Sequence, residues 1–120
     1  MITMRIERDE GCVVCSPHGE IDAWTVPDFR AALVDLVGAP GVVIDLGDVG
    51  FMDSAGLGAL IGAIRRLREA DGVVAVACAR PPLRRLLQTT GLDRVVDVST
   101  TVPAAVARVS QVRQLIVDRS

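Results

Sequence analysis

Two short, uninterrupted apolar runs constrain the fold of this chain more than any other feature. Residues 42–46 are aliphatic except for Asp45, and residues 73–79 are apolar throughout. Runs of this length are typical of strands that are covered on both faces, as in parallel sheets. Segments with helical spacing of apolar residues separate the two runs, and alternating strands and helices predict an α/β domain with right-handed crossovers.

The other elements follow from apolar spacing and turn residues. Alternation over residues 2–7 predicts a half-buried strand, and the apolar residues 12–16 predict its hairpin partner. Pro17 lacks a backbone N–H, so we expect that partner to be bulged or broken near its end. Helices are expected over about residues 26–37, 57–67, 82–90 and 102–116, and a last strand over 95–98. The prediction is one domain over residues 1–120, with a mainly parallel sheet of about five strands, an antiparallel edge strand and about four helices.

Composition excludes several classes of function. Hydrophobic residues form 50% of the 120-residue chain, which is a globular profile. The net charge of −2, the absence of Tyr and the single Trp argue against a nucleic-acid partner, and the charge also argues against an anionic membrane. The first residues lack the apolar run of a signal peptide, and no stretch approaches the roughly 20 apolar residues of a membrane span. With three cysteines, an odd number, we expect a reducing cytoplasm.

The junction between the strand ending near Leu46 and the long helix is the candidate functional site. Functional groups collect at the carboxyl ends of strands in open α/β sheets. Ser54 is expected to be the N-cap of the helix, where unpaired N–H groups and the helix dipole favour negative charge. A phosphate on Ser54 would therefore be tolerated by the fold while adding about −1.5 to −2 charges to the surface. The alternative is that Ser54 is only a cap, contributing about 1 kcal/mol to stability.

Glycines in the long helix add to this picture. Gly58 and Gly62 each cost about 1 kcal/mol relative to Ala. Together with Ala55 and Ala59, they leave part of the helix bare of large side chains. Either a partner approaches this bare face closely, or the helix packs tightly against its own sheet.

A family resemblance unites these features. The segment MDSAGLG at residues 52–58 resembles the phosphorylation-site motif of STAS domains, specifically of stand-alone bacterial anti-sigma factor antagonists. GEID at residues 19–22 resembles the stretch that precedes the first helix in that family, and length and element order also agree.

The resemblance implies partner switching. The unphosphorylated antagonist binds an anti-sigma factor, which is a small serine kinase, and so frees a sigma factor in a bacterial stress response. The kinase phosphorylates the serine, here Ser54, and a PP2C-type phosphatase resets the switch. No catalytic residue, metal or cofactor is implied. Asp22 would shape the kinase-facing surface and Asp53 would position the loop. The expected partner-binding residues are Asp22, Trp24, Asp53, Ser54, Ala55, Gly56, Gly58 and Gly62.

The cysteines have a structural and a functional interpretation. Cys12 and Cys15 form a C-x-x-C motif, but in a strand residues three apart lie about 10 Å apart on opposite faces. We therefore expect buried structural thiols, with redox sensing as the lesser alternative and a metal site as the least. Cys78, in an apolar run, is expected to be a core residue.

Three further features stay open or carry no chemistry. His18, the single histidine, is expected in a loop, and Ser54 lacks the G-x-S-x-G setting of a hydrolase nucleophile. Trp24 is either a plug at the edge of the core or an exposed anchor. The basic positions either solvate helix faces or dock an acidic partner; they are Arg65, Arg66, Arg68, Arg84 and Arg85.

Two alternative functions remain. The chain could be a STAS scaffold or accessory subunit of another signalling or transport complex, insensitive to phosphate on Ser54. An enzyme acting at the same loop is the third possibility, although no phosphate-cradling Gly-Lys-Ser/Thr motif supports it.

Overall fold

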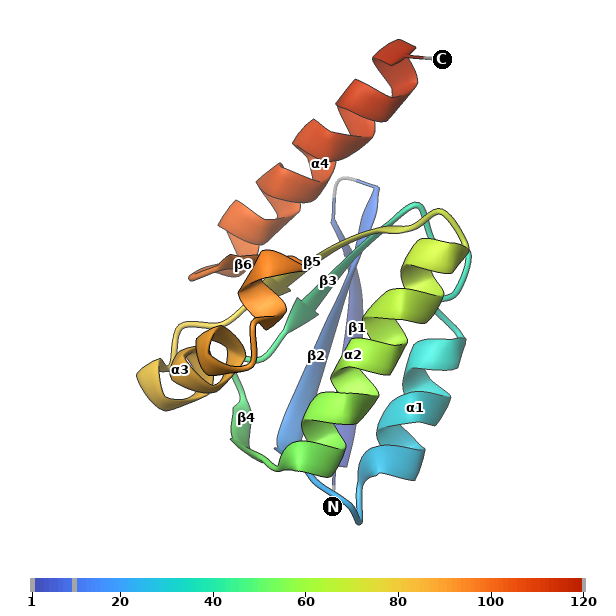
Figure 1. Ribbon diagram of the computed structural model, residues 1–120. Coiled ribbons are helices and arrows are strands. Elements are labelled where there is room, and N and C mark those ends of the chain that lie inside the picture. Colours follow the sequence, from blue (N-terminus) through green and yellow to red (C-terminus); the bar gives the residue numbers. More distant parts are fainter. Residues whose placement is uncertain (1, 10, 120) are drawn as a thin grey trace.

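A single sheet forms the middle layer of the protein (Figure 1). The computed structural model describes residues 2–9 and 11–119, and within them the sheet has six strands in the order β1-β2-β3-β5-β6, with β4 paired to β2. Only β1 and β2 are antiparallel among these described strands, which confirms the mainly parallel sheet with an antiparallel edge. The strands are β1 (Ile2–Asp9), β2 (Cys12–Ile21), β3 (Gly41–Asp45), β4 (Val49–Met52), β5 (Val73–Ala77) and β6 (Asp97–Ser99).

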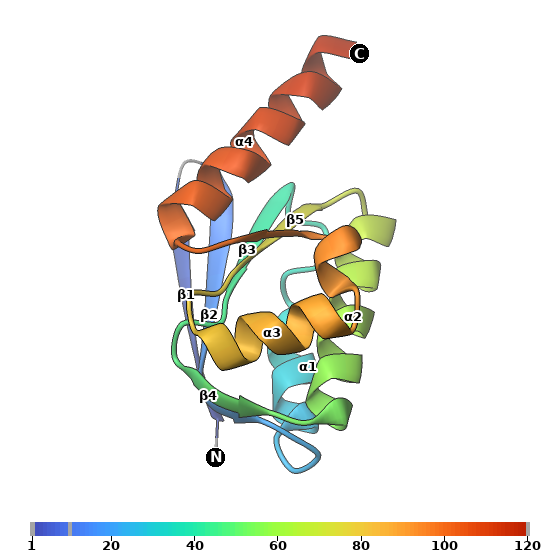
Figure 2. The ribbon, with the colours of Figure 1, turned by 60° about the vertical axis from the view of Figure 1, so that its left-hand side comes forward.

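Helices cover both faces of the sheet (Figure 2). On one face α1 and α2 pack beside each other, and α4 crosses the other face. The helices are α1 (Val26–Val34), α2 (Ser54–Glu69), α3 (Pro81–Thr89) and α4 (Val102–Arg119), with a short 3-10 helix η1 (Leu92–Arg94). The expected four α-helices are thus present in the described part of the chain.

The pleat of the strands divides the core into two clusters. Val42 contributes to the cluster beneath α1 and α2, whereas its neighbour Val43 packs with Val106 and Val109 of α4. Phe29 is fully buried in the first cluster. Because successive strand residues point to opposite faces, an almost continuous apolar run can supply both clusters.

Three details differ from the sequence-based expectation. The irregularity expected in β2 lies between Gly19 and Glu20, and the strand continues through Pro17 to Ile21. Strand β4 was not expected at all. The last strand begins at Asp97 because η1 and a turn occupy the residues before it, so the strand expected over 95–98 is misplaced.

The carboxyl-terminal part of α4 extends beyond the sheet (Figures 1 and 2). Leu115 and Val117 are exposed there. Among the residues that the structure describes, no helix is both long enough and apolar enough to cross a bilayer.

Candidate functional site at the start of helix α2

Asp53 caps helix α2. Its backbone is extended (φ −97°, ψ −175°), and its Oδ1 accepts a hydrogen bond of 2.8 Å from the N–H of Gly56. The N–H of Asp53 itself donates to the carbonyl of Ile21 at 3.3 Å, which holds the residue against the end of β2. The expectation that Ser54 is the N-cap is therefore wrong, because this attachment places Asp53 in the capping position and makes Ser54 the first helical residue.

Ser54 is exposed, and its side chain makes no contact that supports the fold of the described residues. Its hydroxyl forms no hydrogen bond with any residue that the structure describes. The N–H groups of the first turn of a helix lack helical acceptors, and only that of Gly56 is taken by the Asp53 carboxylate. Residues 50–60 contain no Arg or Lys, so no neighbour in sequence would neutralise a phosphate on Ser54.

Asp22 and Asp53 together fix the loop before α1. Oδ1 of Asp22 accepts from the backbone N–H of Trp24 at 3.0 Å and of Thr25 at 3.1 Å. Oδ2 of Asp53 accepts from the N–H of Ala23 at 3.2 Å. The structure thus brings the GEID and MDSAGLG segments side by side, although they lie about 30 residues apart in sequence.

Thr25 occupies the N-cap position of α1. Its hydroxyl does not cap the helix, however. It donates to the carbonyl of Glu20 at 2.7 Å and accepts from the N–H of Asp22 at 2.9 Å. Thr25 therefore stabilises the loop rather than the helix end.

Two exposed aromatic residues lie close in sequence to the Ala23–Asp53 hydrogen bond. Trp24 is 90% exposed. Of the two alternatives, it is therefore not a plug at the edge of the core but an exposed side chain. Phe51 is 55% exposed and lies on β4 opposite Glu20. The sequence analysis missed Phe51 because it missed β4. The signal in the sequence was its position, since Phe51 is one of only two Phe and directly precedes the MDSAGLG segment.

The glycines of α2 fall into two kinds. A Cβ on Gly56 would collide with the backbone carbonyl of Ile21, so this glycine permits the close approach of α2 to β2. A Cβ on Gly58 or Gly62 would meet nothing within 4 Å. Tight packing against the protein's own sheet therefore does not account for Gly58 and Gly62. Ala59, which was grouped with them, is buried and faces the core.

The three cysteines are buried free thiols. Cys12 packs in the cluster beneath α4 and Cys15 in the cluster beneath α1 and α2, which confirms that they lie on opposite faces of β2. Burial raises the pKa of all three thiols, and that of Cys15 reaches about 12. A disulfide or a shared metal between Cys12 and Cys15 would require β2 to come apart.

His18 lies in β2 and not in a loop, so that prediction is wrong. The reason is that the strand runs on to Ile21 rather than ending at Pro17. The His18 ring is exposed, with Nδ1 3.9 Å from Oδ2 of Asp48.

Known proteins are similar to this chain in sequence and architecture. The sequence matches the family described as STAS domain over residues 3–105. The anti-sigma-B factor antagonist of Listeria monocytogenes is 36% identical over 94 residues, which cover 77% of this chain and 82% of the relative. A crystal structure of an anti-sigma factor antagonist from Mycobacterium paratuberculosis superposes with a TM-score of 0.85 at 34% identity, over 92% of this chain and 95% of the other. The phosphorylated form of the Bacillus cell fate determinant SpoIIAA gives a TM-score of 0.66 at 27% identity, over 89% and 99% of the two chains. The chain belongs to the STAS domain family.

Proposed function

We propose that this protein is an anti-sigma factor antagonist whose binding is switched by phosphate on Ser54. The unphosphorylated form would bind a kinase-type anti-sigma factor and so release a sigma factor. The family match and the antagonist relatives support this role. Related chains named anti-sigma-B factor antagonists support a place in a stress response of the cytoplasm.

The observation that carries the proposal is the free hydroxyl of Ser54. Because Asp53 caps α2, the Ser54 hydroxyl is not needed by the fold, and it is exposed at the first helical position. An incoming kinase can reach it without unfolding the helix. A solved relative in a phosphorylated form adds support.

Charge and desolvation explain how a phosphate would end binding. The positive end of the helix dipole tolerates the phosphate, so the antagonist keeps its fold. A partner that covers the start of α2 would instead have to bury about −1.5 to −2 additional charges. Burying an uncompensated charge costs several kcal/mol, enough to dissociate a moderately tight complex.

The surroundings of Ser54 suit a protein partner. Trp24 and Phe51 offer exposed aromatic surface, and aromatic residues dominate the energetics of many interfaces. Ala55 and Gly58 place no large side chain on the exposed side of α2, so a partner's backbone can approach the helix closely. The proposed output is therefore binding and not catalysis. A PP2C-type phosphatase would restore the unphosphorylated form.

The proposal is tested with four baits in a lysate of the source cell: wild type, Ser54→Ala, Ser54→Glu and Thr89→Glu. Thr89→Glu is the matched control, since Thr89 is exposed at the far end of α3 and receives the same charge. We expect a small kinase-type anti-sigma factor on every bait except Ser54→Glu, identified by mass spectrometry. The purified partner and ATP should then place phosphate on Ser54 and lose affinity for the product.

Other outcomes identify the alternatives. Recovery of one set of proteins by all four baits would favour a STAS scaffold or accessory subunit. Recovery lost equally with Thr89→Glu would mean that charge anywhere on the surface weakens binding, and the switch would be rejected. Turnover of a small molecule that requires Ser54 or Asp22 would favour an enzyme.

A further inference from the structure

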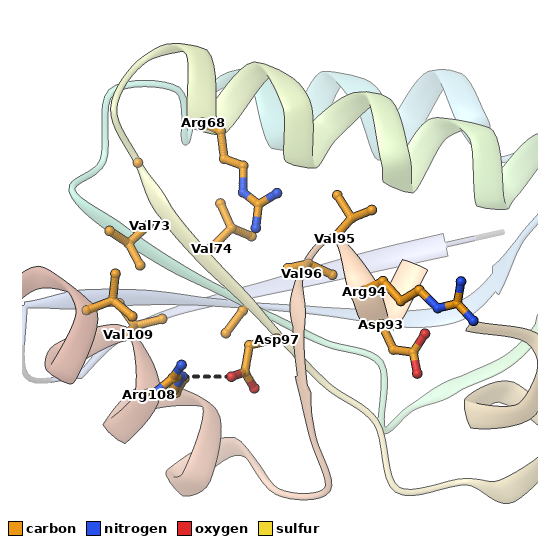
Figure 3. A pocket seen from close by; sticks show the side chains of 13 residues that line it. Arg68, Val73, Val74, Asp93, Arg94, Val95, Val96, Asp97, Arg108 and Val109 are labelled. Carbon is orange, nitrogen blue, oxygen red and sulfur yellow. Dashed lines mark hydrogen bonds and ion pairs between the residues drawn. The ribbon is translucent and has the colours of Figure 1, made fainter. Parts of the chain in front are cut away.

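A cavity opens at the β6 edge of the sheet (Figure 3). Strand β6 pairs with β5 only from Ala75–Asp97 to Ala77–Ser99, so it does not extend alongside Val73 and Val74. The space beside these two residues measures about 400 Å³ and is bounded by the end of α2, by η1 and β6, and by α4. Cavities of roughly 300–1,000 Å³ are typical of small-molecule sites. We call this cavity the edge pocket.

Valine side chains supply the apolar part of the edge pocket, and charged residues line about half of its surface. They come from three separate elements, namely β5, the segment between η1 and β6, and α4. Val95 is 59% exposed, although it is a large aliphatic residue. The contributing residues are Val73, Val74, Val95, Val96, Val109 and Val112.

One cation of the edge pocket, the exposed Arg68, is not neutralised by an ion pair with any described residue. Arg108 and Asp97 neutralise each other through an ion pair of 2.8 Å between Nε and Oδ2. The Arg68 side chain reaches from α2 toward Val74, and it has no hydrogen-bond or ion-pair partner among the described residues. Arg94 and Asp93 extend away from Arg68 and bring one charge of each sign to the rim. The lining therefore carries a net single positive charge, centred on Arg68.

We propose that the edge pocket binds a small organic anion that joins one carboxylate to an apolar body. The carboxylate pairs with the Arg68 guanidinium, whose planar fork matches carboxylate geometry. The apolar body lies against Val74, Val95 and Val112, where it displaces water from apolar surface. A doubly charged phosphate suits the site less well, because the lining carries a net charge of only +1.

The shape of the sheet edge favours a small molecule over an added peptide strand. Only Val73 and Val74 of β5 lack β6 as a neighbour, and two residues of free edge are too short for a new strand to pair. The pocket is also separate from the switch. Arg68 follows Ser54 by 14 positions in α2, which is about 21 Å along the helix axis at 1.5 Å per residue.

The test uses the whole chain labelled with ¹⁵N and followed by two-dimensional NMR at constant pH and ionic strength. The probes are octanoate and 3-phenylpropanoate, with octanol and inorganic phosphate as controls that each lack one half of the proposed ligand. We expect at least one acid to shift the amide signals of Val73, Val74 and Val96 saturably, with a dissociation constant below about 1 mM. Octanol and phosphate should bind at least about tenfold more weakly.

Four variants separate the edge pocket from general effects. Arg68→Gln should weaken binding of the acid at least tenfold. Val95→Asp should do the same, because it places a negative charge, which repels the ligand carboxylate, at an exposed position. Arg66→Gln loses the same charge from the same helix but faces α1, so it should bind like wild type. Ser54→Glu should also bind like wild type.

The proposal is overturned if neither acid produces saturable shifts, or if the shifts lie elsewhere on the protein. Binding of octanol or phosphate as tight as that of the acid would overturn it as well. So would an Arg68→Gln variant that binds the acid as tightly as wild type. These results are independent of the switch, because the test contains no partner protein.

Discussion

The carboxylate of Asp53 accepts a hydrogen bond from the backbone N–H of Ala23, with 3.2 Å between Oδ2 and N, and so joins the loop before α1 to the start of α2. Its other oxygen caps α2 at Gly56. The two structural tasks at this junction thus fall to the residue before Ser54. Neither hydrogen bond involves the side chain of Ser54.

This division of tasks predicts the stability of two neighbouring variants. Asp53→Ala should lower the free energy of unfolding by about 1–2 kcal/mol, because a lost N-cap costs about that much. Ser54→Ala should change it by less than about 0.5 kcal/mol, as for exposed positions without structural contacts. Urea unfolding monitored by circular dichroism measures both. Asp53→Asn is the matched control and should keep most of the stability, since Asn caps helices as well as Asp does. If Ser54→Ala lowered the free energy of unfolding as much as Asp53→Ala does, Ser54 would be the residue that caps α2.

The glycines of α2 should respond to alanine in opposite directions. Gly58→Ala and Gly62→Ala should each raise the free energy of unfolding by about 1 kcal/mol, because the new methyl groups meet nothing and helix propensity improves. Gly56→Ala should lower it by about 1–3 kcal/mol or more, since its Cβ meets the Ile21 carbonyl. Thermal and urea unfolding of the three variants compare them directly.

The same series also tests the partner surface. If a partner's backbone approaches the bare side of α2, Gly58→Ala should weaken the complex although it strengthens the fold. Calorimetric titration against the anti-sigma factor measures this change. A variant that is more stable and binds equally well would remove Gly58 from the interface.

Trp24 offers a direct probe of the interface. Trp24→Ala should change stability by less than about 0.5 kcal/mol because the side chain is 90% exposed. Partner affinity should fall at least about tenfold if Trp24 is an anchor. Trp24 is the only tryptophan, so its fluorescence should also shift to the blue when the partner covers it. Unchanged emission at saturating partner would show that Trp24 lies outside the interface, and Trp24→Phe should retain more affinity than Trp24→Ala.

Alkaline pH should destabilise the fold through the buried thiols. Burial raises the pKa of Cys15 from 9.0 to about 12. Below pH 9 the thiol is protonated in both the folded and the unfolded chain, so its contribution to stability is fully present. Between pH 9 and 12 the unfolded chain releases the proton while the folded chain keeps it, so the free energy of unfolding falls by up to about 1.4 kcal/mol per pH unit for this group.

The composition limits the side chains that titrate between pH 9 and 12. All 13 basic residues are Arg and there is no Tyr, so neither Lys nor Tyr titrates in the same window. The experiment is urea unfolding at a series of pH values from 8 to 11. Cys15→Ala lowers stability at every pH because it leaves a cavity, but it should reduce the slope above pH 9 and leave the part that Cys12 and Cys78 contribute. An unchanged slope in Cys15→Ala would show that this thiol is not the titrating group.

The sequence predicted the order of elements well where apolar periodicity was strong. The covered strands β3 and β5 and the long helix α2 were all located, because runs of Val and the spacing of Leu and Ile leave few alternatives. Strand β4 was missed since it spans only Val49–Met52, includes a glycine and pairs with β2 beyond a register shift. Such a strand is defined by its neighbour and not by its own residues.

The site shows the same limit. Both Asp and Ser are good N-caps, so local propensity could not decide between Asp53 and Ser54. The decision came from the hydrogen bond between the Asp53 N–H and the Ile21 carbonyl, a contact across 32 positions of sequence. The exposure of Trp24 likewise depends on the turn that Asp22 imposes on its loop. Long-range geometry, which residue type does not encode, supplied these features.

The open glycines of α2 also bear on how long the protein lasts in a cell. Free chains open locally more often where a helix is intrinsically weak, and a bound partner suppresses such opening. Amide hydrogen exchange in the middle of α2 should therefore be slower in the complex than in the free chain. Proteases act on opened states, so under the proposed function the form released after phosphorylation would be the one most readily degraded. Turning the switch off would then also shorten the life of the molecule that carried the signal.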